Sequence, residues 1–112
     1  MPHGNSNKNN LDHHLYELRD RVDGAVFKYG ISDKSIDADG LSDRMREQLD
    51  FLNLAVGWLR YFGRILMTGI KPRVKARRLE QDHIDAFEKE HGHLPRGNPL
   101  RRGSKMDDIF QG

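Results

Sequence analysis

Cysteine is absent from this sequence of 112 residues. Its absence excludes disulfide bonds, thiolate chemistry and zinc sites with sulfur ligands. It also fits a reducing compartment. The polar, asparagine-rich N-terminus shows neither the apolar stretch nor the cleavage pattern of a secretory signal. We therefore expect a cytoplasmic protein.

Acidic residues are absent between Phe51 and Leu79, although the chain as a whole is nearly balanced, with a net charge of +2. Residues 1–50 contain 7 Lys and Arg against 10 Asp and Glu, whereas residues 51–112 contain 12 against 7. Such an asymmetry indicates an acidic partner, which could be nucleic acid, a membrane or an acidic protein. The alternative is that the acidic half complements the basic half of the same chain or of a second copy.

A long uncharged apolar run is also missing. The most apolar stretch, Leu49 to Met67, is interrupted by Asn53, Arg60 and Arg64. Each arginine near the middle of a bilayer costs about 2.5–3.5 kcal/mol. Burial in a core or an oligomer interface is therefore the favoured interpretation, and a helix lying on a membrane surface is the alternative.

Apolar residues recur at helical spacing through most of the chain, and no long segment alternates in the manner of a strand. The spacing predicts an all-α, three-helix arrangement with a helical domain over residues 10–92. The expected helices run from about Asn10 to Gly30, from about Ser42 to Thr68 and from about Arg73 to His91. A disordered arm is expected over residues 1–9, and a flexible basic tail over residues 93–112.

The expected central helix is apolar around most of its circumference, which two thin neighbouring helices cannot cover. Surplus apolar surface of this kind usually marks an interface, and a symmetric dimer is its commonest form. The alternative is that the tail folds back and covers it. The predicted interface residues are Phe51, Leu54, Trp58, Tyr61, Phe62 and Ile65.

Basic residues gather at the expected junction of the second and third helices and again in the tail. Clustered Lys and Arg neutralise phosphates and release counterions, but no motif that reads bases accompanies them. The set fits either nucleic acid or an acidic protein. The candidate partner-binding residues are Lys71, Arg73, Lys75, Arg77, Arg78, Arg96, Arg101, Arg102 and Lys105.

No catalytic or metal-binding pattern is evident in the sequence. The histidines lack the spacing of a closed metal site. A loop over residues 35–40 echoes a calcium-binding loop, yet Arg46 stands where the bidentate carboxylate belongs. We therefore expect no catalytic residues, no metal and no cofactor.

These features together favour a non-enzymatic helical protein that self-associates and holds an acidic partner through its basic half. The alternative is an inhibitor or assembly module that acts on an acidic protein surface and does not bind nucleic acid. The small size, charged tails and lack of cysteine are typical of an accessory protein of a phage or other mobile element.

Overall fold

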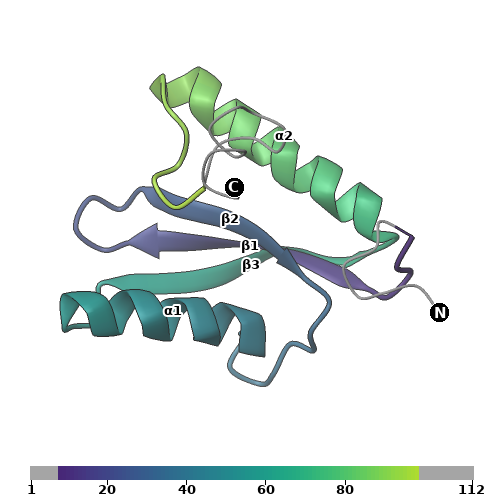
Figure 1. Ribbon diagram of the computed structural model, residues 1–112, viewed down its shortest axis with the longest axis horizontal. Helices are drawn as coiled ribbons and strands as arrows, with labels where there is room; N and C mark the ends of the chain where they lie inside the picture. Colours follow the sequence, from purple (N-terminus) through teal and green to yellow (C-terminus); the bar gives the residue numbers. More distant parts are fainter. Residues whose placement is uncertain (1–7, 99–112) are drawn as a thin grey trace, which may run out of the picture.

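Three antiparallel strands and two helices make up the part of the chain that the computed structural model describes, residues 8–98 (Figure 1). The elements are β1 (His13–Asp20), β2 (Val26–Ser32), α1 (Asp43–Val56), β3 (Tyr61–Ile70) and α2 (Arg73–His91). The strand order in the sheet is β2-β1-β3. The prediction of an all-α, three-helix arrangement is therefore wrong, because a mixed α/β fold takes its place.

The segment predicted as the first helix is a β-hairpin formed by β1 and β2. An Asp-Gly pair, Asp23 and Gly24, lies in the turn, and Gly24 has a φ of 71°. The Asp23 carboxylate accepts a hydrogen bond from the amide of Ala25, which closes the turn. Asp-Gly between two apolar runs is a strong local signal for a hairpin. The prediction of a single helix across this segment did not take the signal into account.

The central strand β1 is buried on both of its faces, since seven of its eight residues are buried. Its sequence, His-His-Leu-Tyr-Glu-Leu-Arg-Asp, places polar and apolar residues on both faces and does not alternate. Leu15 and Leu18 have the three-residue spacing of a helix. In the structure they project from opposite faces of the sheet, into two separate core clusters.

The segment predicted as the central helix divides into α1 and β3. The division occurs at Gly57, whose φ of 80° is the left-handed conformation that ends helices. Asn53 then pairs with the backbone of Tyr61: its side-chain oxygen accepts from the amide of Tyr61 at 2.7 Å, and its side-chain nitrogen donates to the carbonyl at 3.0 Å. This pairing joins the end of α1 to the start of β3.

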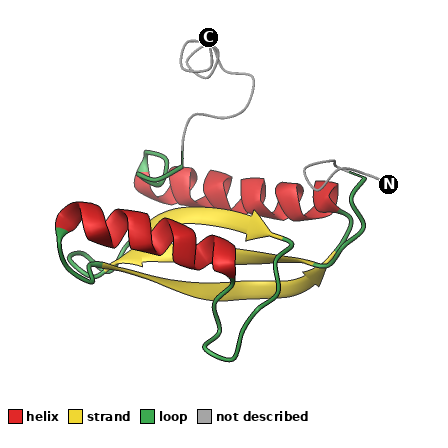
Figure 2. Cartoon of the chain, turned by 60° about the horizontal axis from the view of Figure 1, so that its bottom comes forward, coloured by secondary structure: helices red, strands yellow, loops and turns green. Residues whose placement is uncertain are grey.

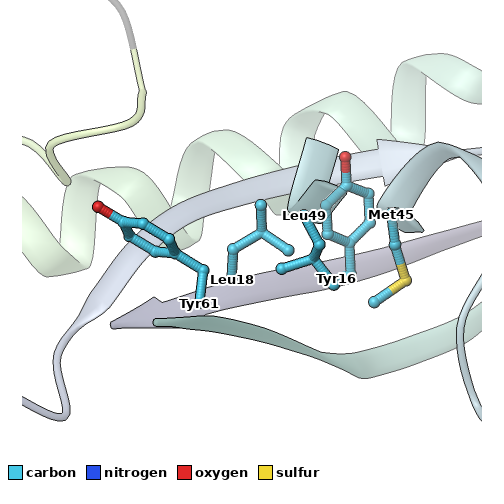
Figure 3. Close-up of a cluster of buried hydrophobic side chains, with 5 residues drawn as sticks. All are labelled: Tyr16, Leu18, Met45, Leu49 and Tyr61. Atoms are coloured by element: carbon cyan, nitrogen blue, oxygen red, sulfur yellow. The ribbon is translucent and has the colours of Figure 1, made fainter. Parts of the chain in front are cut away.

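The two helices pack on opposite faces of the sheet. On one face Met45 and Leu49 of α1 cover Tyr16 and Leu18, together with Tyr61 of β3 (Figure 3). On the other face α2 packs through Ala76 and Leu79 against a second cluster. Figure 2 shows both helices running lengthwise along the strands.

The third predicted helix is confirmed with its boundaries, since α2 begins at Arg73 and ends before Gly92. Beyond it, residues 94–98, here called the strap, run along the outer edge of β2. The Gly97 amide donates to the carbonyl of Phe27 at 2.7 Å, and Pro95 is fully buried. Arg96 and Arg60 both donate hydrogen bonds to the carboxylate of Asp20. Asp20 is buried, and a buried carboxylate is costly unless positive charges pair with it.

Within residues 8–98, neither helix has the length and apolar character needed to cross a bilayer.

Candidate functional site

The site is built around the hydroxyl of Tyr16. The ring of Tyr16 stands on β1 and crosses Gly30 of the neighbouring strand β2, where a Cβ would overlap the ring. Its hydroxyl points toward the side of the sheet on which β2 lies (Figure 3) and donates to the side-chain oxygen of Gln48 at 2.6 Å. The guanidinium of Arg44 lies near enough to lower the pKa of this hydroxyl. Two strands and α1 thus fix the position of this phenol.

Burial keeps the Tyr16 phenol neutral. It raises the pKa of Tyr16 to about 12, against the opposing effect of Arg44. At neutral pH the hydroxyl is therefore a hydrogen-bond donor and acceptor, and it is not a phenolate.

A lysine and a glutamate complete the polar cluster. Lys28 of β2 lies opposite Leu18, on the same face of the sheet as Tyr16. Burial lowers the pKa of Lys28, and the neighbouring Arg44 lowers it further. Glu80 of α2 acts in the opposite direction on Lys28 and also raises the pKa of Tyr16. Arg44 of α1 and Glu80 of α2 therefore act on both the Tyr16 phenol of β1 and the amine of Lys28 of β2.

His14 borders this cluster on β1. Its Nε2 lies 2.9 Å from the hydroxyl oxygen of Ser42, and its ring centroid lies 5.9 Å from that of Tyr16. Burial, and then the neighbouring His13, lower the pKa of His14, so its imidazole stays neutral at neutral pH.

Two hollows flank Arg44. One is mainly polar, has a volume of about 590 Å³ and includes Ser32, Lys34 and Arg73 in its lining. The other is mainly apolar, has a volume of about 510 Å³ and includes Lys28 and Phe51. Arg44 therefore lies on the ridge between a polar surface and an apolar one.

Of the predicted partner-binding residues, only Arg73 lines one of these hollows. Lys71 pairs with Asp12 at 3.5 Å, and Arg96 pairs with Asp20 at 2.6 Å. Lys75, Arg77 and Arg78 follow Arg73 along α2. Arg101, Arg102 and Lys105 lie outside the described residues.

The predicted interface residues fall into two groups. Phe51, Leu54 and Trp58 are exposed, with Leu54 exposed to 85%. Tyr61 is buried in the core, Ile65 packs against that core, and Phe62 lies under the guanidinium of Arg21. The six residues do not form one face, because the segment divides at Gly57.

The calcium-like loop is closed by an arginine. The guanidinium of Arg46 contacts carboxylates of Asp37, Asp39 and Asp43 at 2.7–2.9 Å. No group of three potential metal ligands gathers anywhere in residues 8–98.

Tyr16, Lys28, Arg44 and Glu80 were not among the site residues predicted from the sequence. The Asp-Gly turn could have located two of them, because it predicts a hairpin in which Tyr16 lies opposite Gly30 and Leu18 lies opposite Lys28. The contributions of α1 and α2 depend on tertiary packing and leave no local signal.

The model of a toxin family, described as "URI fold toxin 2", matches residues 6–92. The chain belongs to this family. The match covers both strands of the hairpin, both helices and therefore every residue of the Tyr16 cluster. No curated protein and no solved structure matches the chain. Membership of a toxin family corrects the expectation of a phage or mobile-element accessory protein.

Proposed function

We propose that this toxin-family domain cleaves phosphodiester bonds of nucleic acid at the Tyr16 cluster. The observation that carries the proposal is that Arg44 and Glu80 both act on the buried Tyr16 phenol and on Lys28 of the neighbouring strand. Ionisable groups whose pKa values are shifted by burial and by specific charged neighbours are typical of functional sites.

The cations suit a phosphate. Arg44 presents a planar fork that matches two phosphate oxygens, and Lys28 adds a compact positive charge. Lys34 and Arg73 line the polar hollow beside Arg44, together with the carboxylates of Asp33, Asp43 and Glu47. A chain of phosphates that crosses Arg44 would meet these two further cations within a lining of mixed charge.

The chemistry follows from the two shifted pKa values. Water attacks the phosphorus atom, a new P–O bond forms, and the P–O bond to the leaving oxygen breaks. Lys28, whose lowered pKa favours its neutral amine, takes the proton that the water loses, and the leaving oxygen takes a proton from solvent. The ammonium that forms on Lys28 then supplies positive charge beside the phosphate. The neutral Tyr16 hydroxyl orients the attacking water, and Arg44 stabilises the charge that develops on the phosphoryl oxygens.

Glu80 supplies a carboxylate to the same place. Magnesium is commonly held in proteins by one or two carboxylates together with substrate phosphates. Glu80 would be its protein ligand here, and the ion would add charge stabilisation at the phosphate.

The sequence-based expectation of a non-enzymatic protein that only holds an acidic partner remains the second candidate. The surplus of basic residues after Phe51 supports it. The two candidates share the binding surface and differ in whether a bond is broken.

The test is cleavage of labelled single-stranded and duplex RNA and DNA by the purified chain, with Mg²⁺ and with EDTA. We expect Mg²⁺-dependent cleavage that Tyr16→Phe, Arg44→Ala and Glu80→Gln each reduce by at least about 100-fold. Lys89→Gln, which removes an exposed charge near the end of α2 and lies outside the predicted partner-binding residues, is the matched control and should retain activity.

Lys28→Arg separates binding from proton transfer, because arginine keeps the charge and does not lose its proton at usable pH. We expect normal oligonucleotide affinity with strongly reduced cleavage. In the unmodified chain, cleavage should rise with pH as Lys28 loses its proton. Equal activity of the Tyr16, Arg44 and Glu80 variants, or binding without cleavage of any probe, would support the non-enzymatic candidate.

A further inference from the structure

The apolar hollow opens directly beside the two cations of the site. Leu18 and Phe27 form its floor, Leu52 and Phe51 of α1 form one wall, and Gly97 of the strap forms the other. Lys28 and Arg44 supply two cations to its lining, and Glu47, which pairs with Arg44 at 4.0 Å, supplies one carboxylate. An apolar floor beside two cations matches the two halves of a nucleotide, whose base is flat and apolar on its faces and whose phosphate is anionic.

Phe51 is exposed to 74% although it is a large aromatic residue. It follows Arg44 by seven positions, so the two side chains lie on the same side of α1, two turns apart. An exposed ring next to a phosphate-binding arginine is the arrangement that single-strand-binding proteins use to stack bases.

The opposite wall is held in place by hydrogen bonds. Asn98 accepts from the amide of Tyr29 at 2.9 Å and donates to its carbonyl at 3.0 Å, and the Gly97 amide donates to the carbonyl of Phe27 at 2.7 Å. A Cβ at Gly97 would overlap the ring of Phe27, so only glycine lets the strap lie this close. The hollow is therefore formed before any ligand arrives.

We propose that this hollow is a nucleobase subsite: an unpaired base enters between α1 and the strap and stacks on Phe51, while its phosphate lies on Lys28 and Arg44. The inference rests on the proposed function and narrows its substrate class to nucleic acid with unpaired or extruded nucleotides. A base inside a duplex cannot enter, because its faces are covered by its neighbours.

The test measures oligonucleotide binding to the Tyr16→Phe variant, so that cleavage does not interfere. The probes are a short single strand, the same strand with abasic positions, and the duplex, each as RNA and as DNA. Phe51→Ala should weaken single-strand binding roughly 5- to 150-fold, which corresponds to the loss of one stacked base. It should leave the abasic strand and the duplex unchanged.

Leu54→Ala is the matched control, because Leu54 is exposed to 85% on the same helix and does not line the hollow. Phe51→Trp should retain affinity, and the fluorescence of the new indole should be quenched by the normal strand and not by the abasic one. Circular dichroism of each variant checks that α1 and the sheet are intact.

The outcomes separate this inference from the proposed function. If the chain cleaves nucleic acid but Phe51→Ala binds as Leu54→Ala does, the subsite is refuted and the function stands. If no probe is cleaved but binding still needs both the bases and Phe51, the subsite stands without the reaction. Equal affinity for normal and abasic strands overturns the subsite. A preference for RNA or for DNA identifies the source of the base.

Discussion

Tyr16 makes the stability of the fold sensitive to alkaline pH. Burial raises its pKa from 10.0 to about 12, whereas in the unfolded chain it ionises at its ordinary value. Between these two values the folded state binds more protons than the unfolded state, so the free energy of unfolding falls as pH rises. The full shift corresponds to about 3 kcal/mol.

We therefore expect urea denaturation to show a loss of stability of that order between about pH 10 and pH 12. Tyr16→Phe cannot ionise, so its stability should decline less steeply over the same interval, whatever its stability is at neutral pH. Parallel pH profiles for the two proteins would show that the Tyr16 phenol does not stay neutral in the fold.

Two glycines end helices in this protein, but the sequence predicted only one of these helix ends. Gly92 ended the predicted third helix correctly, since it follows one clear amphipathic stripe. Gly57 ends α1 in the same left-handed conformation, with a φ of 80°. The sequence did not predict this helix end, because apolar residues continue at the four-residue spacing of a helix from Leu54 through Trp58 to Phe62. Phe62 nevertheless lies on β3.

At the scale of elements, two asparagines perform matching tasks. Asn53 pairs with both backbone groups of Tyr61 and joins α1 to β3, whereas Asn98 pairs with both backbone groups of Tyr29 and joins the strap to β2. In each case the side-chain amide makes the two hydrogen bonds that the backbone of a neighbouring strand would otherwise make. Tyr61 is buried, and Tyr29 is half-buried at the sheet edge.

We expect Asn53→Ala to lower the free energy of unfolding by about 1–3 kcal/mol, because it leaves buried backbone groups unpaired. Asn98→Ala should cost less, about 0.5–1.5 kcal/mol, because water reaches the edge of β2. Hydrogen exchange locates each effect: Asn98→Ala should speed exchange of the Tyr29 amide and leave the Tyr61 amide protected. Unchanged exchange at Tyr29 would mean that the strap does not pair with β2.

The pattern of correct and wrong elements has one physical cause. A helix on the surface of a sheet, such as α2, buries a single stripe, and its period survives in the sequence. The central strand β1 lies between α1 and α2 and is buried on both faces, which carry polar as well as apolar residues, so its sequence shows no two-residue alternation. Prediction from spacing therefore succeeded for α2 and failed for the strands.

At the scale of the whole molecule, the candidate site is a product of the topology. Tyr16, Lys28, Arg44 and Glu80 come from four different elements. Basic residues stand at the start of α2, where the sequence predicted them, and Arg73 lines the polar hollow. The sequence could not place Arg44 or Glu80 near Tyr16, because the hairpin and both helices must first assemble.

Self-association is the prediction that belongs to the molecule as a whole. Leu54, Trp58 and Leu59 are exposed to 85%, 51% and 73%, and they lie together at the end of α1 and in the turn that follows it. Exposed apolar residues that gather in this way usually mark an interface. A symmetric dimer would bury the patch of one copy against that of the other.

We expect light scattering after size-exclusion chromatography to show a mass that rises with concentration toward a dimer. Leu54→Asp and Trp58→Asp should each return the chain to a monomer, because a charge buried without a partner in the interface is costly. Neither variant should lose much stability as a monomer, since both side chains are at least half exposed there. Val74→Asp places the same charge on α2, at a residue exposed to 42%, and should leave the dimer intact. A monomeric mass of the unmodified chain at every concentration would show that this patch serves no contact between copies.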